Sequence, residues 1–100
     1  PTFAGHLAEA LVDVGERQLV GVMHIAGGGD CSWADFAAEV FRQSGAQCKV
    51  VPVTTAYFPR PAERPARSVL ASERPEVPRL APWQDGLAVY LAEVTQGLAR

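Results

Sequence analysis

The 100-residue chain has few cysteines and no long apolar run. Cys31 and Cys48 are its only cysteines, and they have neither the paired spacing of a zinc site nor the number that a disulfide framework needs. We therefore expect two reduced, partly buried thiols. No stretch approaches the roughly 18 apolar residues of a membrane-spanning helix, and no signal-peptide pattern opens the chain. These absences favour a cytoplasmic protein without a membrane partner.

The sequence also lacks an excess of one charge. Its 11 acidic and 9 basic side chains give a formal net charge of -2, so no overall field would attract nucleic acid or an anionic membrane. Hydrophobic residues make up 48% of the chain, which is enough for one modest core but leaves no room for a second complete domain. We expect residues 1–100 to form a single unit and, from the abrupt Pro1-Thr2 start, to be a fragment of a longer protein.

Helical spacing of apolar residues predicts a helix over residues 3–14, capped by Thr2 and closed by Gly15. A second helix is predicted after Ser32, because Ser32 and Asp35 resemble a capping box, and it should end at Gly45.

A third helix is predicted from Pro82, which suits a first helical position, to the end of the chain. Trp33 and Trp83 lie in the first turns of the second and third helices, within apolar stripes. For both we favour core packing, with Trp33 fixing its helix on a small sheet, over stacking on a nucleotide base.

Three short segments have strand composition. Residues 20–26 predict a buried strand, and residues 49–53 predict an edge strand because Pro52 cannot donate a ladder hydrogen bond. Residues 68–70 predict a short strand-like piece that needs a partner to bury it. Together with the helices, these segments predict a small mixed α/β unit.

Six of the eight prolines and five of the nine basic residues lie between Pro59 and Pro82. This density excludes a long helix and predicts an extended, ordered loop. Its prolines would hold Arg60, Arg64 and Arg67 at fixed positions. A guanidinium group can donate two parallel hydrogen bonds to two oxygens of one phosphate. A solvated surface loop, paired locally with Glu63, is the alternative that spacing alone leaves open.

Other candidate sites are weak. Gly27-Gly28-Gly29-Asp30 could cradle a phosphate, but the run lacks the spacing of a nucleotide-binding loop and a tight turn is favoured. His6 and His24 have no Cys or acidic residue at the sequence spacing of a metal site or a catalytic pair, so we expect both histidines to have structural roles. No catalytic triad, carboxylate pair or metal cluster is evident.

Four segments occur in a fixed order: residues 1–8 (PTFAGHLA), 21–27 (GVMHIAG), 32–37 (SWADFA) and 64–70 (RPARSVL). Together they resemble the dTDP-4-dehydrorhamnose reductase family shortly after its Rossmann half. Trp83 and Leu87 also match the closing helix of that family. Ala34, Arg67 and Ala71 depart from its usual residues, so the resemblance leaves the exact sugar open.

The resemblance implies a carboxy-terminal, substrate-binding subdomain of a Rossmann-type extended short-chain dehydrogenase/reductase. Such enzymes use NADPH to reduce the 4-keto group of a dTDP-sugar, with an amino-terminal glycine-rich turn and a Tyr-x-x-x-Lys pair. Neither Tyr57 nor Tyr90 is followed by Lys four residues later, so the fragment is predicted to be inactive alone and to bind no cofactor. We also expect an apolar surface where the missing Rossmann half packs, with a tendency to form homo-oligomers.

In sister nucleotide-sugar enzymes the Arg of the matching Arg-Pro segment contacts the diphosphate, which implies the same role for Arg64, with Arg60 and Arg67 as second choices. Two other families remain as alternatives. One resembles the regulatory subunit of methionine adenosyltransferase, which shares the fold but binds a partner enzyme. The other comprises nucleotide-sugar epimerases and dehydratases, whose Arg-Pro-Gly-Asp differs at Ala66-Arg67.

Overall fold

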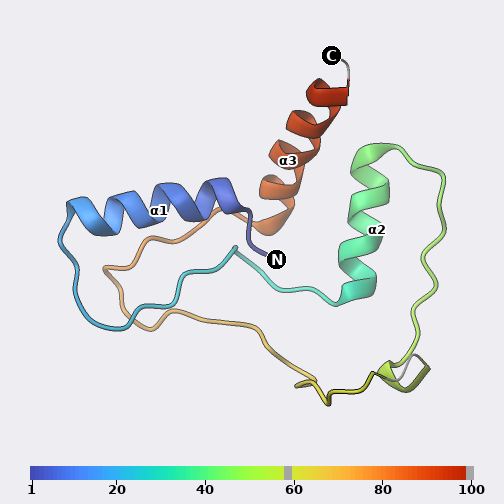
Figure 1. The fold of residues 1–100 in the computed structure, drawn as a ribbon, viewed down its shortest axis with the longest axis horizontal. Coiled ribbons are helices and arrows are strands. Elements are labelled where there is room, and N and C mark those ends of the chain that lie inside the picture. The colour runs from blue at the N-terminus through green and yellow to red at the C-terminus, as the bar shows by residue number, and fades with distance from the viewer. Residues whose placement is uncertain (58–59, 99–100) are drawn as a thin grey trace. The chain divides into compact units, whose positions relative to one another are not determined.

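The computed structural model describes residues 1–57 and 60–98, with three α-helices and one 3-10 turn (Figure 1). Their bounds are α1 (Ala4–Glu16), α2 (Trp33–Ser44), η1 (Thr55–Tyr57) and α3 (Trp83–Leu98). The chain divides into two compact units. The terminal unit comprises Pro1–Asp30 and Leu70–Arg100, and the central unit comprises Cys31–Val69.

Helix α1 is two residues longer than predicted at its end, and its predicted cap is wrong. Phe3, whose side chain has no hydrogen-bond acceptor, is the N-cap, and the Thr2 hydroxyl instead accepts a bond of 2.9 Å from the Gly27 amide. Gly15 lies inside the helix, and the chain leaves it through Gln18, which has a φ of 54°. The sequence pattern located the helix because its apolar spacing is local, whereas the use of Thr2 depends on a distant segment.

The core of the terminal unit lies between helices α1 and α3 and the segment before α3. All four buried apolar residues that the structure describes belong to this unit: Ala10, Val77, Trp83 and Leu87. The first turns of α1 and α3 meet (Figure 1), and a Cβ atom at Gly86 would lie 2.5 Å from the Cβ of Phe3. Trp83, only 6% exposed, therefore has the core role that its stripe predicted.

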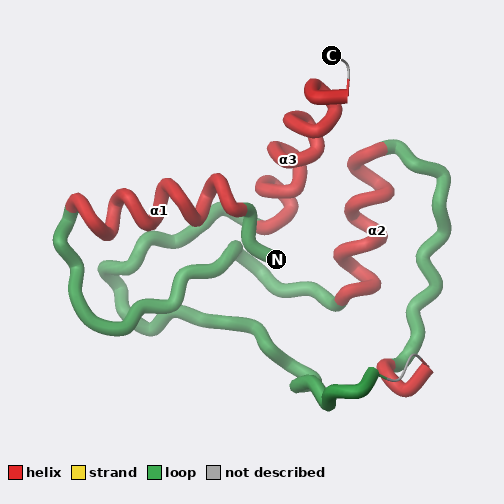
Figure 2. Tube along the Cα trace, in the orientation of Figure 1, coloured by secondary structure: helices red, strands yellow, loops and turns green. Residues whose placement is uncertain are grey.

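The predicted strands are absent from the described residues, where the segments between helices are loops and turns (Figure 2). An isolated parallel bridge joins Gly28 to Pro82. The segment that reaches Pro82 also contains Pro75 and Pro78, and prolines have no N–H to donate to a ladder. It turns at residues 74–77, where the Val77 amide donates to the Arg74 carbonyl at 3.2 Å. The described structure is thus helical, and the predicted mixed α/β sheet is not found in it.

Helix α2 of the central unit confirms its predicted ends. The Ser32 hydroxyl accepts from the Asp35 amide at 3.0 Å and the Asp35 carboxylate accepts from the Ser32 amide, while Gly45 closes the helix with a φ of 76°. The role predicted for Trp33 is wrong. Trp33 is 82% exposed and meets Phe36 edge-on, with ring centroids 6.1 Å apart, because no sheet forms beneath the helix.

The extended segments at 49–53 and 68–70 are also largely exposed. Val51 is 66% exposed and Leu70 is 58% exposed, so the partner expected to bury the second segment is missing among the described residues. Helix α3 begins one residue later than predicted, since Pro82 precedes it and its carbonyl accepts the Asp85 amide. In the part of the chain that the structure describes, no helix combines the length and the apolar character needed to span a bilayer.

Candidate functional site

An exposed arginine-rich loop, residues 60–67, follows the 3-10 turn of the central unit. The structure describes the loop with bends and no helix, as its prolines predicted, while Pro59, where the prediction placed its start, lies outside the described residues. Arg60, Arg64 and Arg67 are all exposed. Pro61 and Pro65 fix their own φ angles, which limits how far the neighbouring arginines can move.

The local ion pair that would make this loop an ordinary surface segment is not present. Within the described residues, Glu63 forms no ion pair with Arg60 or Arg64. Two guanidinium groups of the loop therefore keep their charges uncompensated by the one acidic residue beside them. An anion that binds either group therefore displaces no Glu63 contact.

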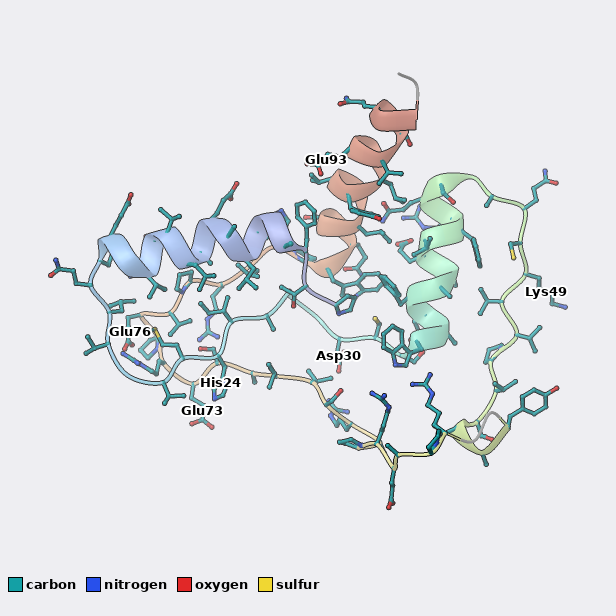
Figure 3. The ribbon with its side chains drawn as sticks, in the orientation of Figure 1. His24, Asp30, Lys49, Glu73, Glu76 and Glu93 are labelled. Carbon is teal, nitrogen blue, oxygen red and sulfur yellow. The ribbon has the colours of Figure 1, made fainter. Side chains whose placement is uncertain are left out.

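Charge is divided unevenly between the two units. By sequence, the central unit has five basic and three acidic side chains, a formal charge of +2, and the terminal unit has four and eight, a formal charge of -4. The single lysine, Lys49, also belongs to the central unit, where it is exposed and extends away from the backbone (Figure 3). An anionic ligand is therefore favoured by the central unit and disfavoured by the terminal one.

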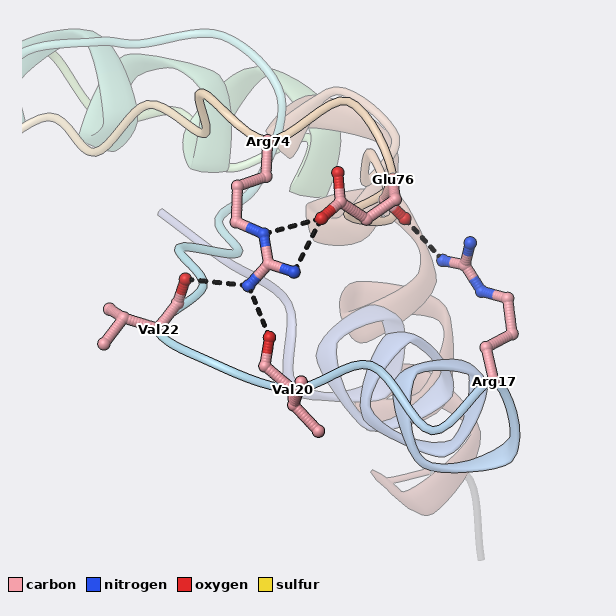
Figure 4. A network of polar contacts seen from close by, with 5 residues as sticks. All are labelled: Arg17, Val20, Val22, Arg74 and Glu76. Atoms are coloured by element: carbon pink, nitrogen blue, oxygen red, sulfur yellow. Dashed lines mark hydrogen bonds and ion pairs between the residues drawn. The ribbon is translucent and has the colours of Figure 1, made fainter.

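The terminal unit holds a different arginine cluster, which the chain itself occupies (Figure 4). Arg74 donates from Nη1 to the carbonyls of Val20 and Val22, at 2.8 and 3.2 Å, and from Nε to the Glu76 carboxylate at 2.7 Å. Arg17 donates from Nη2 to the Glu76 carbonyl at 2.7 Å and pairs with Asp13 at 2.9 Å. We call Arg17, Arg74 and Glu76 the arginine clamp.

The clamp joins segments that are more than 50 residues apart in sequence. The Glu76 backbone amide, followed by the Arg74 guanidinium, holds the pKa of the Glu76 carboxyl below its usual value. Because Arg74 is bound to two carbonyls and one carboxylate, it is not available to a ligand. No sequence signal pointed to this cluster, since none of its long-range contacts follows a local spacing.

The glycine run after residue 26 has the geometry of a turn. The Gly27 amide donates to Thr2 and the Gly28 amide donates to the Ala81 carbonyl at 3.0 Å, while Gly29 has a φ of 81°. Two of the amides that a phosphate cradle would present are thus used within the protein. This agrees with the tight turn that the sequence favoured.

The remaining candidates form no site. His6 meets the Phe3 ring edge-on at 5.1 Å, and His24 is exposed. Cys31 is partly buried, as expected, whereas Cys48 is exposed. No cluster of three or more metal-ligating side chains occurs among the described residues.

Comparison with known proteins finds one family across nearly the whole chain. Residues 1–96 match the family described as the RmlD substrate binding domain. A probable dTDP-4,6-dihydroxy-2-methyloxan-3-one 4-ketoreductase from Streptomyces antibioticus is 44% identical over 87 residues, which are 85% of this chain and 30% of that protein. A dTDP-4-dehydrorhamnose reductase from Mycobacterium tuberculosis (strain CDC 1551 / Oshkosh) is 39% identical over 97 residues, 92% of this chain and 32% of that protein.

A solved structure agrees. The crystal structure of a dTDP-4-dehydrorhamnose reductase from Clostridium acetobutylicum matches this chain with a TM-score of 0.89 and 38% sequence identity. The match covers 95% of this chain and 35% of the chain in that crystal structure. The chain thus spans about a third of the length of the proteins that it matches.

Proposed function

Because the chain belongs to the RmlD substrate binding domain family, we propose that it is the nucleotide-sugar-binding portion of a dTDP-4-dehydrorhamnose reductase. The observation that carries the proposal is the match over residues 1–96, supported by a reductase that is 39% identical over 92% of the chain. The longer polypeptide that would contain this chain is called the parent polypeptide below. Its reaction would be the NADPH-dependent reduction of dTDP-4-dehydro-L-rhamnose to dTDP-L-rhamnose, a precursor of bacterial surface polysaccharides.

The residues of this chain do not fit the cofactor. Its glycine run has no dinucleotide-binding spacing and the amides of Gly27 and Gly28 already have protein partners. Tyr57 and Tyr90 lack the lysine that a proton-donating pair needs. We therefore assign NADPH and the proton donor to the remainder of the parent polypeptide, and the sugar nucleotide to this chain.

The arginine loop is the proposed contact for the diphosphate, with Arg64 as the main residue. Pro65 biases Arg64 towards an extended backbone, so less entropy is lost when its side chain is fixed. A guanidinium stays protonated at any working pH and offers a planar pair of donors to two phosphate oxygens. The exposure of Arg64, the lack of an ion pair between Glu63 and Arg64 among the described residues, and the positive charge of the central unit support this role. Arg60 and Arg67 are proposed as second contacts.

A coupled assay tests the proposed activity. The purified parent polypeptide should oxidise NADPH when dTDP-4-dehydro-L-rhamnose is added, while residues 1–100 alone should not. dTDP-glucose, which has no 4-keto group, is the matched control substrate and should give no turnover. A parent polypeptide that leaves NADPH unchanged with every dTDP-4-keto sugar would refute the proposed function.

A second candidate has the same chemistry and a different sugar. The 44% identity to the ketoreductase from Streptomyces antibioticus favours a reductase that acts on another dTDP-linked ketosugar. The ratio of kcat/KM for that relative's substrate to kcat/KM for dTDP-4-dehydro-L-rhamnose separates the two. A ratio below one supports the rhamnose precursor, and a ratio above one supports the second candidate.

A further inference from the structure

Trp33 has the most exposed aromatic side chain that the structure describes. It is 82% exposed, and Tyr57, in the same central unit, follows with 67%. The Trp33 ring meets Phe36 edge-on, at an interplanar angle of 76°, so this contact leaves at least one face of the indole ring uncovered. Because an apolar ring of this size is unfavourable in water, its exposure indicates a partner that covers it in the functional protein.

The first turn of α2 holds Trp33 in place. Trp33 is the first residue of the helix and lies inside its capping box. The Ser32 hydroxyl accepts from the Asp35 amide at 3.0 Å, and the Asp35 carboxylate accepts from the Ser32 amide at 3.3 Å. An aromatic ring on a turn fixed in this way loses little backbone freedom when a ligand stacks on it, which favours binding.

The neighbours of Trp33 along the chain are polar or small. Ser32 and Asp35 are exposed, and Ala34 is half-buried. A permanent protein interface normally needs a continuous apolar area, whereas a site for a planar and partly polar ligand combines an aromatic ring with a few polar groups. The surroundings of Trp33 therefore fit a small ligand better than a broad apolar interface.

The arginine loop supplies the matching charge within the same unit. The central unit has a formal charge of +2 by sequence, and Arg60 and Arg64 form no ion pair with Glu63 among the described residues. In Figure 1 the loop, drawn in yellow, lies on the side of this unit where α2 begins. An exposed aromatic ring combined with guanidinium groups suits a nucleotide, which has a flat base at one end and anionic phosphates at the other.

We propose that Trp33 stacks on the thymine base of the bound dTDP-sugar while Arg64 contacts its diphosphate. The inference rests on the proposed function and adds the residue that recognises the base. Tyr57 is less suited to this role, because its ring is smaller and it lies on a three-residue 3-10 turn instead of a capped helix.

Isothermal titration of the parent polypeptide with dTDP and with inorganic pyrophosphate, which lacks the base, tests the proposal. Trp33→Ala should raise the dissociation constant for dTDP about five- to a hundredfold, as expected for the loss of one stacked base, and should leave that for pyrophosphate unchanged. Trp33→Phe, which keeps an aromatic face, should retain most of the dTDP affinity. Tyr57→Ala is the matched control and should leave both dissociation constants unchanged.

Three results would overturn the proposal. The first is an unchanged dissociation constant for dTDP in Trp33→Ala, and a lower melting temperature of that ligand-free variant would then show that the rest of the parent polypeptide covers Trp33. The second is an equal loss of affinity for dTDP and pyrophosphate, which would mean that Trp33 does not contact the base. The third is a loss in Tyr57→Ala larger than that in Trp33→Ala, which would assign the base to Tyr57.

The proposed function fails in a different way. A parent polypeptide that binds dTDP through Trp33 and yet reduces no dTDP-4-keto sugar would count against the proposed function alone. A parent polypeptide that oxidises NADPH with the same KM for its dTDP-sugar before and after Trp33→Ala would overturn the inference and leave the proposed function standing.

Discussion

The terminal and central units are stabilised in different ways. The terminal unit contains every buried residue that the structure describes, and three of its segments are joined by polar contacts between positions 25 to 59 residues apart. The central unit has no buried residue among those described, and its capping box, its Arg42–Glu39 ion pair and its Trp33–Phe36 ring contact all join near neighbours in the sequence. The comparison separates a unit with a packed core from a unit whose described side chains are largely exposed.

The two units also differ in what their arginines do. In the arginine clamp, guanidinium groups bind carbonyls and carboxylates of the terminal unit and so serve structure. In the arginine loop, Arg60 and Arg64 have no such ion pairs with Glu63. Loops that bind ligands are commonly drawn from the less stable part of a fold, which agrees with a binding loop in the central unit.

The two tryptophans give the largest expected contrast. Trp83→Ala should destabilise the chain by about 3–5 kcal/mol, because it removes a large side chain that is only 6% exposed. Trp33→Ala is the matched control and should change stability by less than about 0.5 kcal/mol, since Trp33 is 82% exposed. Urea unfolding followed by circular dichroism measures both. Equal losses would mean that the two units are packed alike.

A pair of glycines in helix α3 sharpens the same comparison within one element. Gly86→Ala should cost about 1–3 kcal/mol, since the new methyl group would lie 2.5 Å from the Cβ of Phe3. Gly97→Ala meets no atom within 4 Å and should stabilise the helix by about 0.5–1 kcal/mol. The sign of the change in melting temperature decides the matter: a stabilising Gly86→Ala would show that α1 and α3 do not approach closely.

The arginine clamp provides a smaller effect. Arg74→Ala removes bonds to Val20, Val22 and Glu76 and should cost about 1 kcal/mol, a value reduced because the side chain is 33% exposed. Arg42→Ala breaks only a local pair in the central unit and should cost less. Both variants would be followed by urea unfolding. A larger loss of unfolding free energy for Arg42→Ala than for Arg74→Ala would contradict the view that arginine contacts stabilise the terminal unit more than the central unit.

The pH dependence of stability is expected to show the smallest effect. The folded-state pKa of Glu76 is below its unfolded value, so its stabilising contribution is complete above the unfolded pKa, near 4.5, and is lost as pH falls through the folded pKa. Glu76→Gln should therefore flatten the melting temperature between about pH 5 and pH 3 relative to the unchanged chain. Identical acid profiles for the two proteins would show that the clamp carboxylate does not stabilise the terminal unit.

The sequence predicted those parts of the fold that local patterns determine. Helix α2 follows from Ser32, Asp35 and Gly45, which lie within the helix or at its ends, and the stripe containing Trp83 identified a core residue. The predicted strands do not form among the described residues, because strand composition does not show whether a pairing partner is within reach. The prolines beside Val77 removed the nearest one.

The candidate site was predictable only in part. The Arg-Pro pattern identified Arg60, Arg64 and Arg67 as exposed charges, since prolines and charges keep a loop at the surface. The arginine clamp could not be predicted, because its contacts span more than 50 residues. The exposure of Trp33 was missed for the same reason: an apolar stripe shows which face is apolar, and it does not show what covers that face.

The most direct test of the account is the affinity of the parent polypeptide for dTDP, measured by isothermal titration with variants of Arg64. Arg64→Ala should raise the dissociation constant roughly ten- to more than a hundredfold, as expected for the loss of a charge-assisted contact of about 1.5–3 kcal/mol. Arg64→Lys should restore little, because an ammonium cannot bind two phosphate oxygens as a planar fork does. Arg79→Ala, which removes the same charge from the terminal unit, should leave the affinity unchanged. If both Arg64 variants bind dTDP as the unmodified protein does, the arginine loop is an ordinary surface loop and the account is contradicted.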